Sequence, residues 1–368
     1  MEKRRERIAG WLLWAALTLP VLLLGLFYLM RDNLEFMDRW VYDVVGPLEQ
    51  FLGRIWSHFP FSVVELIAAF LIIWSIAYLA ITVAGLFQKR SFPRIARRLM
   101  ILTAVWLWIL ASFYWLWNST YYASTFSQRS NLYPRSSSVD ELAAVTEYFA
   151  KQAAQLSSDI KRDQELHWDE NLETCFEFCP KLYNNIVEEF PVLDIPSVKA
   201  KPFLFSKLQS FLGFTGIYAP FTGEANINVD APGCLIPSTI GHEMSHQRMV
   251  ASEQEANFVG ITACTSSDSE VFQYSGYLSG LIYLCNALYS VSPDRWFDIA
   301  GAEFTPELAT DWSDNNDYWE AFSSPVGDIS DKAYDSFLKH NDQELGIQSY
   351  GACVDLLVSY YLPIIPSQ

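Results

Sequence analysis

The chain has 368 residues, of which 51% are hydrophobic and only 18% charged, against roughly 25% charged residues in an ordinary soluble protein. The charge is divided unevenly: residues 1–118 carry 12 Lys and Arg against 8 Asp and Glu, whereas residues 119–368 carry 13 against 34. The acidic second part has no cationic cluster for phosphate groups, which excludes a nucleic-acid partner. Its many aromatic residues exclude intrinsic disorder.

Three apolar stretches in residues 1–118 are long enough to cross about 30 Å of hydrocarbon as helices. The first follows a basic N-terminus like that of a signal peptide, but its apolar run is too long and no small-residue cleavage site closes it. We therefore expect an uncleaved anchor, a membrane domain over residues 1–118 and the lipid bilayer as a partner. The spans run from about Ile8 to Met30, from about Val63 to Phe87 and from about Met100 to Trp117.

Basic residues in the flanks of these spans predict the orientation. The N-terminal flank and the connection after the second span are rich in Lys and Arg, whereas the connection after the first span carries more acidic than basic residues. Cationic flanks stay on the cytoplasmic side during insertion, so we expect a multi-pass protein of the cell membrane with a cytoplasmic N-terminus and an extracytoplasmic chain after Asn118. The basic residues are Lys3, Arg4, Arg5 and Arg7, then Lys89, Arg90, Arg94, Arg97 and Arg98.

All six cysteines fall in the part expected outside the cytoplasm. An even number in an oxidising compartment permits up to three disulfides, while buried thiols explain the same residues equally well. Cys175 and Cys179 have the spacing of half a zinc site, but no second pair lies where the other half would be needed. The cysteines are Cys175, Cys179, Cys234, Cys264, Cys285 and Cys353.

The remaining chain predicts a linker over residues 119–135 and a mainly α domain (α+β) over residues 136–368. Capping residues at 136–140 favour a helix through Ala150, and the Gly- and Thr-rich stretch 216–229 indicates a hairpin or strand pair. Gly223 to Asn228 is a candidate edge strand for an extended peptide. Further helices are expected over Asn171–Glu189, from Pro237 to about Tyr289, and within Asp328–Leu362.

One motif carries chemistry: residues 242–246 read His-Glu-Met-Ser-His. Residues four apart lie on one face of a helix, so the imidazoles of His242 and His246 can reach one Zn2+ ion. Glu243 lies about 100° round the helix, where a carboxylate can act as the general base toward water. The other histidines, His58, His167 and His340, are remote in sequence.

A zinc site of this kind needs a third protein ligand, and a carboxylate is the natural choice. In the stretch 252–258, Ser252 can cap a helix with Glu255 at the third position, a capping box that gives Glu255 a structural role. Glu253 is then the expected third ligand and Glu255 the alternative. Asn257 lies four residues after Glu253 on the same face, placed to support it from a second shell.

These motifs resemble two groups of proteins. The motif at 242–246 followed by Glu253, Ala256 and Asn257 is similar to gluzincins, zinc metallopeptidases with two His ligands and one Glu ligand. Nearly the whole chain resembles an uncharacterised family of bacterial membrane proteins known as a domain of unknown function. That family has glycine where this chain has Met249, a departure at the turn toward the third ligand. The shared segments are Thr222–Asn226, His242–Gln247, Glu253–Phe258, Tyr274–Tyr277 and Ser349–Gly351.

The expected function is that of a membrane-anchored zinc metallopeptidase that hydrolyses peptide bonds of envelope or secreted proteins. Tyr274, Tyr277 and Tyr350 are candidates for an oxyanion donor, but each is better explained as a packed aromatic residue. The polar flanks of the motif argue against a site within the membrane. The alternatives are a non-catalytic envelope sensor or assembly factor that keeps the zinc fold, and a zinc hydrolase for a non-peptide amide.

Overall fold

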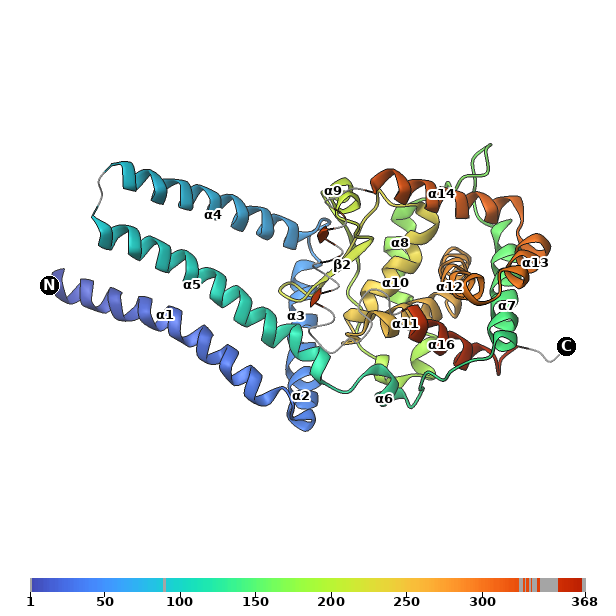
Figure 1. The fold of residues 1–368 in the computed structure, drawn as a ribbon, viewed down its shortest axis with the longest axis horizontal. Helices are drawn as coiled ribbons and strands as arrows, with labels where there is room; N and C mark the ends of the chain where they lie inside the picture. The colour runs from blue at the N-terminus through green and yellow to red at the C-terminus, as the bar shows by residue number, and fades with distance from the viewer. Residues whose placement is uncertain are drawn as a thin grey trace. The chain divides into compact units, whose positions relative to one another are not determined.

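The computed structural model describes residues 2–88, 91–323, 327, 329–330, 332, 336–337 and 350–365. The chain forms two compact units, the first from Met1–Pro47 with Val63–Ala123 and the second from Leu48–Ser62 with Ser124–Gln368 (Figure 1). Leu48–Ser62, the second half of the connection between the first two apolar stretches, therefore folds with the second unit. Lys89, Arg90, His340, Ser349 and much of the stretch expected to be helical after Asp328 lie outside the described residues.

The first unit contains three helices that are long and apolar enough to cross a membrane, over Ile8–Met30, Val63–Phe87 and Phe92–Tyr122. They belong to α1 (Glu2–Met30), α4 (Val63–Phe87) and α5 (Phe92–Leu116) (Figure 1). The apolar helices predicted over Ile8–Met30 and Val63–Phe87 are present with these bounds, and the third begins at Phe92 instead of Met100. Its N-terminal cap is Ser91, and Pro93 occupies the first turn, where a missing N–H costs no hydrogen bond.

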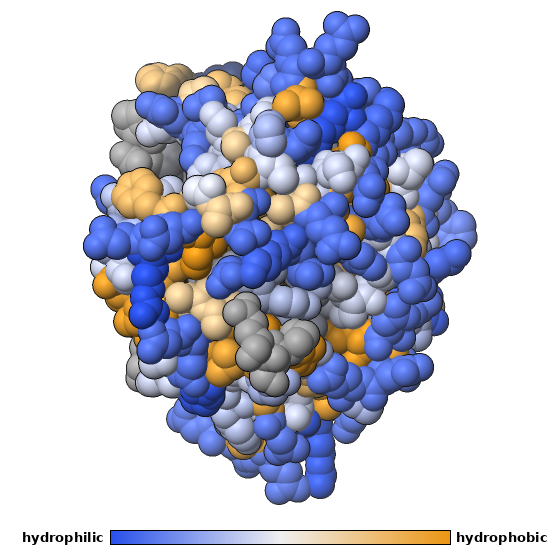
Figure 2. Space-filling model, turned by 90° about the vertical axis from the view of Figure 1, so that its right-hand side faces the viewer, coloured by the Kyte–Doolittle hydropathy of each residue, from blue (hydrophilic) through white to orange (hydrophobic). Residues whose placement is uncertain are grey.

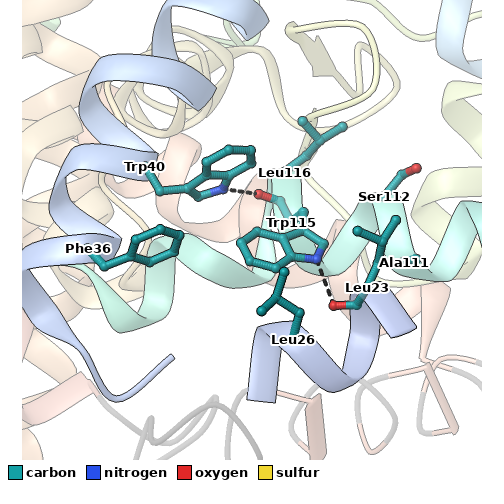
Figure 3. Close-up of a pocket in the computed structure, with 8 residues that line it drawn as sticks. All are labelled: Leu23, Leu26, Phe36, Trp40, Ala111, Ser112, Trp115 and Leu116. Atoms are coloured by element: carbon teal, nitrogen blue, oxygen red, sulfur yellow. Dashed lines mark hydrogen bonds between the residues drawn. The ribbon is translucent and has the colours of Figure 1, made fainter. Parts of the chain in front are cut away.

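At one end of α1 and α5, two tryptophans tie the helices of the first unit together. The indole N–H of Trp115 donates to the carbonyl of Leu23 at 3.0 Å, and that of Trp40 donates to the carbonyl of Trp115 at 2.8 Å (Figure 3). Trp40 ends the short helix α2 (Leu34–Trp40), which a π-helical turn at Val41–Val45 follows. The indoles border a pocket of about 470 Å3, and with both donors already bonded, its walls are mostly hydrocarbon. The lining residues are Leu23, Leu26, Phe36, Trp40, Ala111, Ser112, Trp115 and Leu116.

The second unit is mostly helical. Ser138 and Glu141 form a capping box at the start of α7, where the sequence predicted capping residues. The predicted helix over 171–189 is broken after Phe178, because Pro180 cannot donate to the helix ladder and short 3-10 turns follow. Its helices are α3 (Gly46–Trp56, beginning at the boundary of the units), α6 (Phe126–Ser130), α7 (Val139–Ser157), α8 (Leu172–Phe178), α9 (Ser206–Phe211), α10 (Ile236–His246), α11 (Glu253–Thr265), α12 (Glu270–Val291), α13 (Pro293–Glu303), α14 (Pro306–Phe322) and α16 (Tyr350–Tyr361).

A three-stranded sheet completes the second unit, from β1 (Lys201–Pro202), β2 (Gly216–Ala219) and β3 (Glu224–Ile227), in the order β1-β3-β2. The predicted strand pair is confirmed, because β2 and β3 are antiparallel with Gly216 opposite Ile227 and Ala219 opposite Glu224. The prediction that 223–228 forms the edge was wrong. β3 is the central strand, with β1 parallel on its other side, so the edge beside α10 is β2.

The core of the second unit surrounds α12, which packs against α7, α10, α11, α13 and α16 (Figure 1). All six cysteines are buried and unpaired, so they act as small apolar side chains and no disulfide forms. Burial raises the pKa of the Cys175 thiol to about 11. Figure 2 shows a face of the molecule that is largely hydrophilic with scattered apolar patches, as expected of a surface in contact with water.

Candidate metal centre

His242 and His246 lie one turn apart on α10, and their side chains converge. Their Nε2 atoms are 3.2 Å apart, and the two rings meet edge to face at 89°. His246 Nδ1 lies 2.7 Å from the carbonyl oxygen of Val250, which accepts only an N–H. In the neutral imidazole that hydrogen bond assigns the proton to Nδ1, so the lone pair of Nε2 points toward His242 Nε2 and is free to bind a metal ion.

A left-handed turn at Met249 brings the Val250 carbonyl to His246. Met249 has φ 58°, and the Val250 N–H donates back to the carbonyl of Ser245 at 3.3 Å, which ends the helix. Glycine is favoured in this conformation because it has no Cβ to clash with the backbone. Met249 adopts this turn with its side chain buried at 3% exposure.

Glu253 is the first residue of α11, and its carboxylate faces both imidazoles. Glu253 Oε2 lies 3.2 Å from His242 Nε2, and Oε1 lies 3.7 Å from His246 Nε2. One ligand atom from each of the three residues falls within 4.8 Å of the others. The side chains of His242 and Glu253 are 17% and 22% exposed while that of His246 is 5% exposed, so the cluster can be reached from one side.

Glu255, the alternative ligand, is directed elsewhere. Its two carboxylate oxygens accept the backbone N–H groups of Phe126 and Ser127 at 2.8 and 2.9 Å, at the start of α6. The predicted capping box is absent, because the side chain of Ser252 makes no capping hydrogen bond. Glu255 therefore has a structural role, but in another helix. Asn257 is half-buried on α11 and makes no side-chain hydrogen bond to Glu253 among the described residues.

Glu243 lies between α10 and the edge strand β2. A Cβ placed on Gly216 would be 2.5 Å from Glu243 Oε1, so only glycine allows the carboxylate this close to the strand. The backbone of Tyr218 also faces this carboxylate and lowers its pKa. The side chain is 4% exposed, and its Oε2 atom is buried without a hydrogen-bond partner in the described part of the chain.

The acid groups and imidazoles of the cluster set each other's protonation. Burial lowers the pKa of His246, but the Glu253 charge outweighs that effect and raises it to about 9. Burial raises the pKa of Glu253, yet the neighbouring imidazoles hold it well below its usual range. Burial also raises the pKa of Glu243. The cluster thus concentrates negative charge that attracts a proton or another cation.

The last turn of α10 is anchored by a buried arginine that the sequence analysis did not single out. Arg248 stacks on the ring of Tyr183 at 3.6 Å, and its guanidinium donates to the carbonyl of Met244 at 2.9 Å and to Ser197 Oγ at 2.6 Å. The Tyr183 hydroxyl donates to the carbonyl of Gly241 at 2.7 Å. Together these contacts hold both ends of the motif. The sequence around Arg248 gave no sign of these contacts, because Ser197 lies 51 residues before Arg248 and Tyr183 lies 58 residues before Gly241.

The remaining predicted residues take part in other contacts. The hydroxyl of Tyr274 donates to Asp311, and that of Tyr277 lies 3.5 Å from the hydroxyl of Tyr148. Both therefore behave as packed aromatic residues. The side chain of Tyr350 lies outside what the structure describes. The remote histidines also bond elsewhere, His58 to the carbonyls of Arg54 and Ile55, and His167 to Asp314.

Comparison with known proteins gives one match. The model of the family described as "Protein of unknown function (DUF3810)" fits residues 41–358. No curated protein and no solved structure matches the chain significantly. The matched range begins at Val41, so it includes α3 together with the second and third apolar helices and most of the second unit.

Proposed function

Because the chain belongs to this family of proteins of unknown function, its activity has to be argued from its own residues, and we propose that it is a zinc-dependent metallopeptidase anchored in the cell membrane. The observation that carries the proposal is the convergence of His242, His246 and Glu253, with Glu243 buried beside them. Two imidazoles and one carboxylate form a donor set found in catalytic zinc sites, where the fourth position stays open.

The geometry fits zinc. Two nitrogen ligands at about 2.0–2.1 Å from a tetrahedral ion are roughly 3.3–3.4 Å apart, close to the 3.2 Å between the two Nε2 atoms. The hydrogen bond from His246 Nδ1 to the Val250 carbonyl is the outer contact that orients a metal-binding imidazole. A bound zinc ion would supply Lewis-acid polarisation of a carbonyl and lower the pKa of water to about 7.

Glu243 has the properties of a general base. Its Oε1 lies against β2 at Gly216, whereas Oε2 has no partner among the described residues. Oε2 can therefore take a proton from an attacking water and return it to the leaving amine of a peptide. A purely structural zinc site has no use for a buried carboxylate in that place, which favours catalysis over a sensor or assembly role.

We place the second unit outside the cytoplasm, where envelope or secreted proteins are the substrates. The basic N-terminus and the basic connection between the second and third apolar helices support this orientation. The cysteines give this orientation no support, because all six are unpaired and a free thiol does not require an oxidising compartment. The polar flanks of the motif, among them Gln247, Arg248 and Glu253, favour a site beside the membrane over one within it.

The proposal is tested on the full-length protein in detergent. We expect one zinc ion per chain in the wild type and in Glu243→Gln, and none in His246→Ala. We also expect the wild type, but not Glu243→Gln, to cleave peptides of a proteome-derived mixture analysed by mass spectrometry. Wild-type protein without metal would refute any zinc function. Metal without cleavage of this mixture would refute the peptidase, leaving the sensor or assembly role, or an amide substrate other than a peptide.

A further inference from the structure

The segment between the first two apolar helices contributes a buried acid to the second unit. Glu49 on α3 is fully buried, and its Oε2 accepts the hydroxyl hydrogen of Tyr218 at 2.6 Å. Its Oε1 is buried without a hydrogen-bond partner in the described part of the chain. Burial raises the pKa of Glu49 well above its ordinary value, while the bond from Tyr218 lowers it to a smaller extent.

Tyr218 joins this acid to the proposed general base. Its side chain bonds to Glu49, while its backbone faces the carboxylate of Glu243 and lowers the pKa of that group. Two residues earlier on the same strand, Gly216 is in contact with the Glu243 side chain. A displacement of β2 would therefore move the groups that fix Glu243.

The other strands are tied to the same segment. Lys201 of β1 donates through Nζ to the carbonyl of Trp56 at 2.5 Å and to the carboxylate of Glu224 of β3 at 2.6 Å. The side chains of Lys201 and Glu224 are 5% and 1% exposed. The turn between β2 and β3 packs directly on the α3 backbone, because a Cβ on Gly223 would lie 2.0 Å from the carbonyl oxygen of Glu49.

We propose that α3 is part of the scaffold of the metal centre and that Glu49 is a positioning residue, which acts through Tyr218 to hold β2 where it aligns Glu243. This inference rests on the proposed peptidase function. Glu49 touches neither the metal ligands nor a substrate. Its loss should therefore lower turnover while metal and substrate binding stay intact.

The test uses full-length, zinc-loaded protein and one quenched-fluorescence decapeptide, the fastest-cleaved member of a random library screened with the wild type. We expect Tyr218→Phe and Glu49→Leu to lower kcat about 10- to 100-fold, since a misplacement of about 1 Å can cost 10²-fold, with KM within twofold and zinc still at one ion per chain. Glu49→Gln keeps the acceptor and should recover kcat to within about threefold of the wild type.

Tyr360→Phe is the matched control, because it removes another hydrogen bond from a tyrosine to a glutamate, Glu189, on a helix that supplies no residue of the metal centre. It should leave kcat unchanged. The inference is overturned if Tyr218→Phe and Glu49→Leu turn over like the wild type, if their zinc content falls in parallel with kcat, or if Glu49→Gln is as impaired as Glu49→Leu.

A second measurement does not need activity. Hydrogen exchange of the peptide 214–220 should be about tenfold faster in Tyr218→Phe and Glu49→Leu than in the wild type, because the bond that fixes β2 is lost. It should be unchanged in Tyr360→Phe. If the wild type cleaves no peptide, the peptidase proposal fails by itself. Exchange at β2 then still decides whether Glu49 positions the strand, and unchanged exchange overturns that role.

Discussion

The close approach of α10 and α11 determines where Glu253 lies relative to the two imidazoles, and Gly260→Ala tests it. A Cβ on Gly260 would be 2.6 Å from the His242 backbone N, whereas ordinary contact begins at 3.4 Å. The neighbour is helix backbone and cannot move aside like a flexible side chain. The two helices must therefore separate by about 0.8 Å at a point two turns from Glu253.

That separation is large compared with the tolerance of a metal site. Ligand distances have to lie within about 0.2 Å of their ideal values. We expect the zinc affinity to fall about 10- to 100-fold, or about 1.4–2.7 kcal/mol. The effect on folding should be smaller, because overpacking costs about 1–3 kcal/mol while alanine gains about 1 kcal/mol of helix propensity over glycine.

The measurement is competition for zinc against a chromophoric chelator, run on the full-length protein together with denaturant unfolding. Gly301→Ala is the control, since a Cβ on Gly301 of α13 meets nothing within 4 Å. It should keep wild-type zinc affinity. Wild-type affinity in Gly260→Ala would refute the reasoning that the contact between the helices positions the ligands.

Three further substitutions separate the roles assigned around the site. Glu253→Gln should abolish stoichiometric zinc binding. Glu255→Ala should keep the zinc and lower the free energy of unfolding by roughly 2 kcal/mol, because its two hydrogen bonds to α6 are lost. Metal analysis and urea unfolding measure the two effects, and loss of zinc in both variants would contradict the assignment. Met249→Gly should keep the zinc and destabilise the fold by about 1 kcal/mol in urea unfolding. Loss of the buried Met side chain costs about 2–3 kcal/mol, whereas relief of the left-handed backbone strain returns about 1–2 kcal/mol. A gain in stability would show that the backbone strain is the larger effect. The raised pKa of Glu49 means that the folded state holds a proton that the unfolded state releases above about pH 4.5. The contribution of Glu49 to the free energy of unfolding therefore declines as the pH rises from about 4.5 through the folded pKa. Glu49→Gln should flatten that decline in urea unfolding at several pH values, and an unchanged pH dependence would contradict this prediction.

The sequence allowed prediction of elements that depend on local pattern. The first two apolar helices are continuous apolar runs and were predicted with their bounds. The helix after Ser138 was predicted from its capping residues, but it runs to Ser157 and not to Ala150. The third span was predicted too short, because its arginine-rich first turns do not look apolar although Pro93 starts a helix there. The helix after Asn171 was predicted too long, since the interruption at Pro180 was overlooked.

The site was predictable only where it depends on helix geometry. The spacing of His242, Glu243 and His246 places both imidazoles on one face whatever the rest of the fold does. The preference for Glu253 over Glu255 rested on a capping box that does not form. What distinguishes the two carboxylates is a pair of N–H groups at Phe126 and Ser127, almost 130 residues away, and no local pattern reports such a contact.

The contacts of α3 with the sheet make the predicted boundary between residues 118 and 119 a poor place to divide the chain. A protein beginning at residue 119 would keep His242, His246 and Glu253 but lose α3. Lys201 would then remain buried beside Glu224 without the carbonyls of Trp56 and Phe61, and the hydroxyl of Tyr218 would lose Glu49. Unpaired buried polar groups cost about 1–3 kcal/mol each, so the sheet that holds Glu243 would be weakened in the fragment. Absence of activity in such a fragment would therefore reflect the missing segment, and the chemistry of the site has to be measured on the full chain.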